Sequence, residues 1–287
     1  MSRNEAGRSF RSGGSGSGEF GGHRARKRFS QNFLVDAGVI ARIAATIAPR
    51  RDDRMVEIGP GRGALTDLLV DAVDELTVIE IDRDLVGGLR EHHPDLSIIE
   101  GDALQVDYAA LFEDERPFRV VGNLPYNIST PLMFRLLEYA PLVEDALFML
   151  QEEVVQRLSA VPGEKAWGRL GIMIQYHCVV ESLFAVPREA FQPRPGVDSR
   201  IVRLIPHDRP PCPAEDPRTF EQVVRAAFSQ RRKTLRNGLK TLAGEAAPRI
   251  ALLEAAGIDL GVRPETLSVE AFVDIANRFT AAGLGAD

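Results

Sequence analysis

Hydrophobic and polar positions change their spacing in a regular way from about residue 36 onward. Val39, Ile40, Ile43, Ala44 and Ile47 recur at helical spacing, which predicts an amphipathic helix. Short strand-like runs follow, with segments of helical spacing between them. The strand-like runs are RMVEIG (54–59), LTVIEI (76–81), LSIIEG (96–101), FRVVGN (118–123) and ALFML (146–150). The helical segments include ALTDLLVDAV (64–73) and PLMFRLLEYA (131–140). Such alternation indicates an α/β fold with a parallel sheet covered by helices on both faces.

The pattern changes after SRIVRLIP (199–206), where a proline-rich bridge runs to residue 217. Beyond the bridge the spacing is helical only, as in FEQVVRAAF, KTLRNGLKTL, RIALLEAAG and VEAFVDIANRF. We therefore predict a sheet domain over 29–206 and a smaller all-helical domain over 207–287. Residues 1–28 begin with a Gly- and Ser-rich stretch and end in basic residues, and they predict a flexible tail that buries no apolar surface.

Composition is ordinary for a folded protein of this size. The 287 residues are 44% hydrophobic, which suits one large domain and one smaller domain. No apolar run approaches membrane-spanning length, and the start lacks the apolar block of a secretory signal, so we expect no membrane partner. The two cysteines are Cys178, in a segment expected to be helical, and Cys212, in the proline-rich bridge. They form no CxxC pair, so we expect neither a disulfide nor a metal site, and a cytoplasmic location fits.

The net charge of −6 hides a strong asymmetry along the chain. Residues 52–115 contain 18 acidic residues and only 4 arginines, so the rest of the chain carries a basic surplus. Part of that surplus lies at 24–28, and more lies in the acid-free segment 222–244. Because local fields decide what binds, the acidic average does not exclude a nucleic-acid partner.

A glycine-rich loop follows the first strand-like run, with the sequence EIGPGRGALT (57–66). Gly59 and Gly61 let the backbone turn tightly and approach a ligand where a Cβ atom would clash. A simple strand-to-helix turn without a ligand is one interpretation. A pyridine-dinucleotide site is another, because Gly59, Gly61 and Ala64 also satisfy the looser dinucleotide fingerprint.

Acidic residues at the next two strand ends narrow this choice. Glu80 closes the second run, about 20 residues after the loop, where a carboxylate can accept both hydroxyls of a ribose. Asp102 follows the third run and could accept the exocyclic amine of an adenine. Either residue alone could be an exposed loop acid. Together they favour a cofactor that contains a nucleoside, bound at the carboxyl ends of the strands.

The fourth run ends in Asn123-Leu124-Pro125-Tyr126, which combines an amide, a rigid turn and an aromatic ring. The exocyclic amine of adenine is a poor nucleophile because its lone pair is delocalised into the ring. The Asn123 side-chain oxygen and the Leu124 carbonyl could accept its two N–H bonds and draw the nitrogen towards tetrahedral geometry. Such preorganised acceptors stabilise the positive charge that develops on nitrogen during attack. A plain turn is the alternative.

These motifs, in this order and spacing, resemble the S-adenosylmethionine-dependent RNA adenine-N6 dimethyltransferases. The similarity is greatest to the bacterial small-subunit (16S) ribosomal RNA enzymes of the KsgA type. It extends from KRFSQNFL (27–34) through FQPRPGVDS (191–199) and FSQRRKTLRNGL (228–239), almost to the C-terminus. The resemblance implies a Rossmann-like methyltransferase sheet, S-adenosylmethionine as cofactor, and dimethylation of N6, on two adjacent adenosines of 16S ribosomal RNA, during small-subunit assembly.

The resemblance also implies roles for individual residues. The expected cofactor-binding residues are Asn32, Leu34, Gly59, Gly61, Glu80, Ile81, Asp102, Ala103 and Asn123. The expected catalytic residues are Asn123, Leu124, Pro125, Tyr126 and Phe191, with Tyr126 and Phe191 stacking on the two faces of a flipped adenine. Phe191 could instead be a core aromatic. No catalytic histidine is expected: His92 and His93 suggest a surface loop, and His177 is expected to pack or hydrate on its helix.

Partner recognition is expected from a basic helix near the start of the C-terminal domain. Arg231, Arg232, Lys233 and Arg236 are predicted to lie on adjoining turns of one helix and to contact RNA phosphates, although a solvated charged face is the alternative. We expect a monomer. Two other functions stay open: a macrolide-resistance-type enzyme acting on large-subunit ribosomal RNA, and a non-catalytic ribosome-assembly or RNA-binding factor on the same fold.

Overall fold

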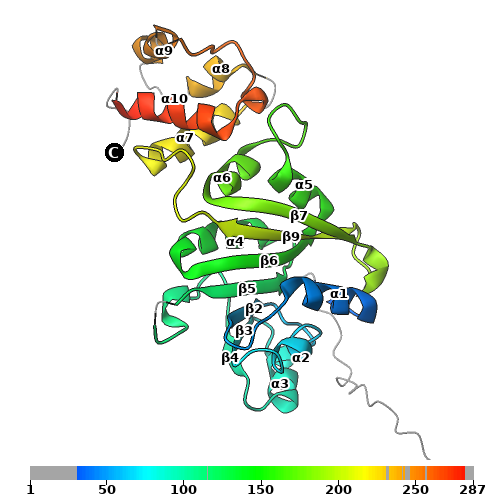
Figure 1. Ribbon diagram of the computed structural model, residues 1–287. Helices are drawn as coiled ribbons and strands as arrows, with labels where there is room; N and C mark the ends of the chain where they lie inside the picture. Colours follow the sequence, from blue (N-terminus) through cyan, green and yellow to red (C-terminus); the bar gives the residue numbers. More distant parts are fainter. Residues whose placement is uncertain are drawn as a thin grey trace, which may run out of the picture.

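The computed structural model describes residues 31–114, 116–230, 233–240, 242, 246–255 and 257–281. Figure 1 shows a twisted sheet flanked by helices, with a separate group of helices beyond one of its edges. The helices α1 to α6 are Ala37–Ile47, Thr66–Leu69, Arg83–His92, Ser129–Leu137, Glu152–Ser159 and Arg169–His177. The helices α7 to α10 are Pro217–Ala227, Leu235–Leu239, Ala246–Ala255 and Val269–Ala281. Within the described residues, no helix is long and apolar enough to cross a lipid bilayer.

The main sheet has seven strands in the order β4-β3-β2-β5-β6-β9-β7. Their bounds are β2 Arg54–Ile58, β3 Glu75–Glu80, β4 Ser97–Glu100, β5 Phe118–Asn123, β6 Val143–Gln151, β7 Cys178–Val186 and β9 Ser199–Pro206. The first five strands in this order are mutually parallel, as predicted. Strand β9 is antiparallel to both β6 and β7, which the sequence pattern did not reveal.

The segment around Cys178 corrects one expectation. We expected Cys178 in an apolar helix, but α6 ends at His177 and Cys178 is the first residue of β7. Cys178 is 2% exposed, and burial raises the pKa of its thiol to about 12. The apolar run continues across the helix–strand boundary, so periodicity alone did not locate the boundary.

Alternate residues of the central strands build two separate cores. Val56, Val120 and Phe148 face the side covered by α4, α5 and α6, whereas Met55 and Val121 face the side covered by α1 and α2. This alternation is the period of two expected for strands that are buried on both faces. The helix expected over 64–73 is shorter than predicted, because α2 begins only at Thr66 and the chain turns after Leu69 to reach β3.

The C-terminal helices share a third core with α6. Trp167 donates its indole N–H to the Leu267 carbonyl at 2.8 Å, and the Tyr176 hydroxyl accepts from the Ala214 N–H at 3.0 Å. Figure 1 places α7 to α10 beyond the β7 edge of the sheet, at the end opposite β4. The segment 160–176 therefore contributes to the packing of both parts of the chain, while the boundary at 206 stays a prediction.

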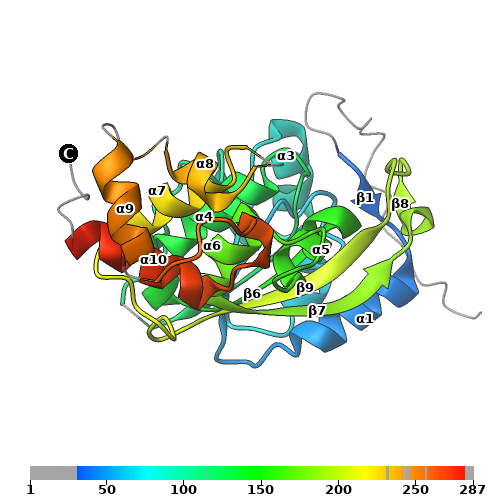
Figure 2. The same cartoon turned by 90° about the horizontal axis from the view of Figure 1, so that it is seen from above.

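A small second sheet completes the fold. Strand β1 (Phe33–Leu34) pairs antiparallel with β8 (Phe191–Gln192), so that Leu34 lies opposite Phe191. Figure 2 shows this pair at the end of the molecule away from α9 and α10. This pairing holds the first described residues against the carboxyl ends of the parallel strands.

Candidate active site

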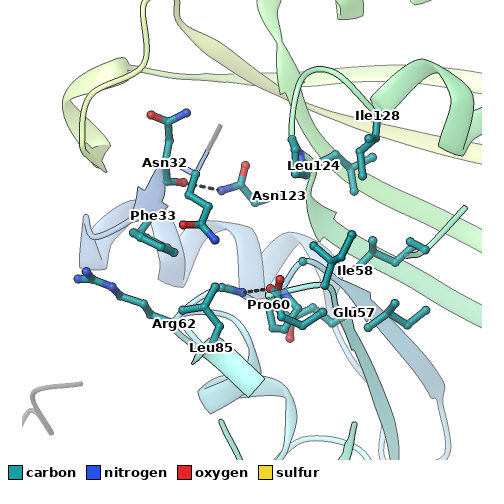
Figure 3. A pocket seen from close by; sticks show the side chains of 18 of the residues that line it. Asn32, Phe33, Glu57, Ile58, Pro60, Arg62, Leu85, Asn123, Leu124 and Ile128 are labelled. Atoms are coloured by element: carbon teal, nitrogen blue, oxygen red, sulfur yellow. Dashed lines mark hydrogen bonds between the residues drawn. The ribbon is translucent and has the colours of Figure 1, made fainter. Parts of the chain in front are cut away.

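A cavity of about 200 Å³ opens at the carboxyl ends of β2, β3 and β5 (Figure 3). Every residue expected to bind the cofactor or to act on the target base lines it: Asn32, Leu34, Gly59, Gly61, Glu80, Ile81, Asp102, Ala103, Asn123, Leu124, Pro125, Tyr126 and Phe191. These residues come from six separate segments of the chain. The parallel register is what brings them to one crevice.

The glycine loop after β2 wraps one wall of the cavity. Gly61 has a φ of +61°, and a Cβ atom there would lie 3.2 Å from the Phe33 ring, so a side chain at this position would be both strained and crowded. At Gly122, one residue before Asn123, a Cβ atom would lie only 2.5 Å from the Ile58 carbonyl oxygen. The close approach of β2 and β5 therefore requires glycine, and it sets where Asn123 leaves the sheet.

Glu80 ends β3 as a buried carboxylate without a cationic partner among the described residues. Its two oxygens accept from the Asp82 N–H at 2.9 Å and from the Gly61 N–H at 3.3 Å. Burial raises the pKa of this carboxyl, although these backbone hydrogen bonds act in the opposite direction. A carboxylate has about four lone-pair sites, so acceptor capacity is left for ligand hydroxyls.

Asp102 and Ala103 follow β4 on the neighbouring wall. One Asp102 oxygen accepts from the Leu104 N–H at 3.0 Å, which fixes the carboxylate at the start of the turn. Ala103 is buried and belongs to the core on the α4 side of the sheet. This wall therefore combines an oriented acceptor with an apolar surface, which suits a base edge and its ring.

Residues 31–34 form the opposite side of the cavity and are tied down at three points. The Gln31 side-chain amide donates to Asp82 Oδ2 at 2.7 Å, and the Asn32 carbonyl accepts from the Asn123 side-chain amide at 3.2 Å. The Arg62 guanidinium lies over the Phe33 ring, 4.4 Å from its centroid. The sequence alone indicates neither Phe33 nor Arg62 as a site residue, because no local pattern shows that these segments meet.

The Asn123–Tyr126 motif at the end of β5 presents acceptors to the cavity. The Asn123 amide nitrogen donates to Asn32, which orients its Oδ1, and no donor to Oδ1 or to the Leu124 carbonyl occurs among the described residues. The Tyr126 hydroxyl lies 3.2 Å from Ser199 Oγ, and burial raises the pKa of this phenol. The tyrosine is therefore neutral at physiological pH, which suits a stacking surface.

Phe191 lines the cavity and also belongs to the protein core. It is 3% exposed and packs in the same cluster as Leu34 and Ile43. The two interpretations left open from the sequence therefore coexist geometrically, and its role as a stacking partner stays a prediction.

Glu57 is a buried acid of the site to which the sequence pattern assigns no role. It lies behind the glycine loop, 2% exposed, and accepts from the Thr66 hydroxyl at 2.6 Å. Burial raises the pKa of Glu57 to about 7, and the nearby Asp67 and Glu80 carboxylates contribute, while the Thr66 hydrogen bond opposes the shift. The cavity is therefore bordered by two buried acids, Glu57 and Glu80, that no described cation neutralises.

The expected RNA-binding helix differs from the prediction. Arg231 and Arg232 lie outside the described residues. Lys233 occupies a bend, and α8 begins only at Leu235 after the cap residue Thr234, so Lys233 and Arg236 do not share one helix. Arg236 forms an ion pair with Glu254 of α9. At least one of the four expected phosphate contacts is therefore already engaged within the protein.

Sequence comparisons identify relatives along almost the whole chain. The family described as Ribosomal RNA adenine dimethylase matches residues 22–281. A protein of Chromohalobacter salexigens named Ribosomal RNA small subunit methyltransferase A is 60% identical over 262 residues, covering 89% of this chain and 91% of that protein. A protein of the same name from Pseudomonas aeruginosa is 56% identical over 259 residues, covering 89% of this chain and 95% of its own.

Solved structures with the same fold include two nucleic-acid methyltransferases. A dimethyladenosine transferase from Plasmodium falciparum superposes with a TM-score of 0.74 at 26% identity, covering 88% of this chain and 98% of its own. The 23S rRNA methyltransferase ErmE superposes with a TM-score of 0.65 at 30% identity, covering 87% of this chain and 100% of its own. The expected α/β methyltransferase fold is thereby confirmed.

Proposed function

The chain belongs to the ribosomal RNA adenine dimethylase family, and we propose that it transfers methyl groups from S-adenosylmethionine to N6 of adenosines in small-subunit 16S ribosomal RNA. The observation that carries this proposal is the meeting of two kinds of group in one cavity. Glu80 and Asp102 suit a nucleoside cofactor, and Asn123 Oδ1 and the Leu124 carbonyl suit the amine of a target adenine. Binding of a pyridine dinucleotide would not account for the second pair of acceptors, Asn123 Oδ1 and the Leu124 carbonyl.

The residues present fit S-adenosylmethionine. Glu80 would hold the ribose hydroxyls, and Asp102 with Ala103 and Ile81 would frame the cofactor adenine. Gly59, Gly61, Asn32 and Leu34 would surround the methionine portion. The Glu80 and Asp102 carboxylates keep acceptor capacity beyond their backbone hydrogen bonds, which a ligand rich in hydroxyl and amine donors can use. When bound, this cofactor supplies a methyl group on a positively charged sulfur.

The chain's own residues prepare the attacking nitrogen. Asn123 Oδ1 and the Leu124 carbonyl would accept the two N6–H bonds, which localises the lone pair on nitrogen. Transfer forms a carbon–nitrogen bond and breaks the carbon–sulfur bond, and the same two acceptors stabilise the positive charge that N6 gains. The excess proton then leaves to solvent, so no general base is assigned. Pro125 fixes the turn that presents these acceptors.

The adenine must leave the base stack to reach this cavity. N6 is hidden in a duplex, so the target lies in a loop or is flipped out. Tyr126 would stack on one face of the base, with Phe191 beside the other. The methylation of two adjacent adenosines, each twice, requires that the site accept a mono-methylated amine as well as the unmodified one.

The large-subunit alternative is less well supported. ErmE, a 23S rRNA methyltransferase, is 30% identical to this chain, whereas proteins named for the small subunit are 56 and 60% identical. We propose that the enzyme is a cytoplasmic monomer and that its partner is an assembling small ribosomal subunit. The C-terminal helices would contact the RNA.

The decisive experiment combines labelled S-adenosylmethionine with undermethylated small and large ribosomal particles. We expect label in dimethyladenosine of small-subunit RNA only. Asn123→Ala should lower turnover by about 100-fold or more, because a preorganised acceptor is lost. Gln156→Ala, at an exposed position on α5 that does not line the cavity, is the matched control and should change turnover little. Methylation of large-subunit RNA, or an Asn123→Ala variant of full activity, would overturn the proposal.

A further inference from the structure

Outside the cavity, three side chains with metal-binding atoms meet between α2 and α3. They are Asp67 on α2, His92 at the end of α3, and His93, which caps that helix. One ligand atom from each lies within 4.8 Å of the others. Asp67 Oδ1 is 2.8 Å from His93 Nε2 and 3.9 Å from His92 Nε2. The two helices stand side by side at the β4 end of the sheet (Figure 1).

We propose that Asp67, His92 and His93 form a binding site for one divalent transition-metal ion of the zinc type. Zinc binds imidazole nitrogen and carboxylate oxygen at about 2.0–2.2 Å, which places neighbouring ligand atoms of a tetrahedral site roughly 3.4 Å apart. The two distances from Asp67 Oδ1 to the histidine nitrogens, 2.8 and 3.9 Å, lie on either side of that value, and all three ligand atoms lie within 4.8 Å of one another. Asp67 and His92 are both 47% exposed, so their side chains can rotate to close the difference, and water supplies the fourth ligand.

The ligand set also selects the class of metal. Two imidazoles and one carboxylate suit zinc, nickel, cobalt or copper, whereas magnesium and calcium require a shell of oxygen ligands. The sequence predicted no metal site, because its two cysteines form no CxxC pair. The ligands come from two positions separated by about 25 residues, and only the packing of α2 on α3 brings them together.

The position of this site links it to the glycine loop. The Asp67 N–H donates to the Gly63 carbonyl at 2.9 Å, and a Cβ atom at Gly63 would lie 3.2 Å from Asp67 Oδ1. On the other side, α3 carries Leu85, which lines the cavity. A bound ion would therefore join the helix that follows the glycine loop to the helix that follows β3, and would stabilise the folded domain.

The test is titration of the full chain with zinc chloride by calorimetry at neutral pH. The His23→Ala background removes the histidine of the N-terminal segment. We expect one ion per chain. His92→Ala, His93→Ala and Asp67→Asn should each weaken binding by at least about tenfold, since even the loss of an outer-shell partner costs 10–100-fold. His207→Ala, in the proline-rich bridge, is the matched control and should leave the affinity unchanged.

Two further measurements make the outcome decisive. Zinc should raise the melting temperature of the parent chain but not of the His92→Ala/His93→Ala double variant, because ligand binding to the folded state stabilises it. Excess magnesium should not displace zinc. The proposal fails if zinc does not bind, if these substitutions leave binding intact, or if magnesium competes equally. None of these readouts depends on methyl transfer.

Discussion

Buried charged side chains lie at both ends of the parallel sheet, but only those at the amino end form ion pairs among the described residues. At the amino end, Arg119 of β5 is 7% exposed and donates to Asp53 at 2.8 Å and to Asp145 at 2.8 and 3.0 Å. A further N–H reaches the Ile47 carbonyl at 2.8 Å. At the carboxyl end, Glu57 and Glu80 are also buried, at 2% and 6% exposure, but no described cation pairs with either of them.

The pKa values reflect this difference. Burial acts to raise the pKa of Asp53, but hydrogen bonds from Arg50 and Arg119 outweigh it and leave the value lowered. For Glu57 and Glu80 burial dominates, and both pKa values are raised. Buried acids at the amino end of the sheet are thus paired with an arginine. Glu57 and Glu80 at the carboxyl end, where a ligand is expected, have no described cation beside them, and pKa values shifted by burial are common at functional sites.

Removal of Arg119 is the strongest way to break the matched end. Arg119→Met would leave Asp53 and Asp145 without their shared buried cation, so we expect a loss of about 3–5 kcal/mol in the free energy of unfolding. Arg51→Met is the matched control, because the Arg51–Asp74 ion pair is largely exposed and should be worth less than about 1 kcal/mol. Urea unfolding at neutral pH measures both. Equal losses would show that the amino end is not a stabilising network.

Glu80 tests the unmatched end through ligand affinity. Glu80→Gln keeps the size of the side chain but removes the negative charge that accepts ribose hydroxyls. We expect the Kd for S-adenosylhomocysteine to rise about 10- to 100-fold, which corresponds to 1–3 kcal/mol. Glu100→Gln is the control: Glu100 is the register partner of Glu80 on β4, but it pairs with Arg83 at the surface. Calorimetry measures both Kd values. If the two substitutions change the Kd equally, Glu80 does not bind the ribose.

Glu57 should respond to pH with the opposite sign from a salt-bridged acid. Its pKa is about 7 in the folded state and 4.5 in the unfolded chain, so between these values the folded state binds more protons. Stability therefore falls as pH rises from about 4.5 through 7. Glu57→Gln keeps an acceptor for Thr66 and removes the ionisation, so it should be more stable than the parent by about 1–3 kcal/mol at pH 8.

The same variant supplies its own control in acid. Near pH 5 the parent side chain is already neutral in the folded state, so the difference between the two proteins should shrink. Glu113→Gln, at an exposed position, should show neither effect. Urea unfolding of the three proteins at pH 5 and 8 measures these differences in stability. A parent protein that gains stability between these values, relative to Glu57→Gln, would show that Glu57 is ionised and satisfied.

The sequence predicted the carboxyl end well because backbone rules place its residues. Strand ends, glycine positions and the Asn-Leu-Pro-Tyr turn follow from local patterns, and parallel register then carries Gly59, Glu80 and Asn123 to one edge. Contacts between distant side chains follow no such rule. The Arg62–Phe33 stacking and the Asp67–His93 contact depend on how separate segments pack, so nothing in the sequence indicated them.

The wrong predictions outside the site also have physical reasons. Strand β7 was missed because its apolar residues continue directly from α6, so the period changes without a turn signal. The prediction that Lys233 and Arg236 share one helix was wrong because the chain bends at Lys233 and α8 begins only at Leu235, while their RNA contacts stay a prediction. Charge alone also does not reveal that Arg236 has a partner within the protein. Glu254 lies 18 residues after Arg236, and only the packing of α9 beside α8 pairs them.

Arg236 gives the test with the smallest expected effect. It distinguishes a positive charge that can contact RNA from one that is already paired within the protein. The Arg236–Glu254 ion pair is about 40% exposed on each side, so Arg236→Gln should cost less than about 1 kcal/mol of stability. In RNA binding, each phosphate contact contributes about 0.9 to the slope of log affinity against log salt. We expect Arg231→Gln/Arg232→Gln/Lys233→Gln to flatten that slope and Arg236→Gln to leave it unchanged, since Arg236 is already neutralised. Glu254→Gln, which releases Arg236, should steepen it. If Arg236→Gln flattens the slope by a full contact, the ion pair opens on RNA, and the charge pattern of the sequence describes the bound state better than the free structure does.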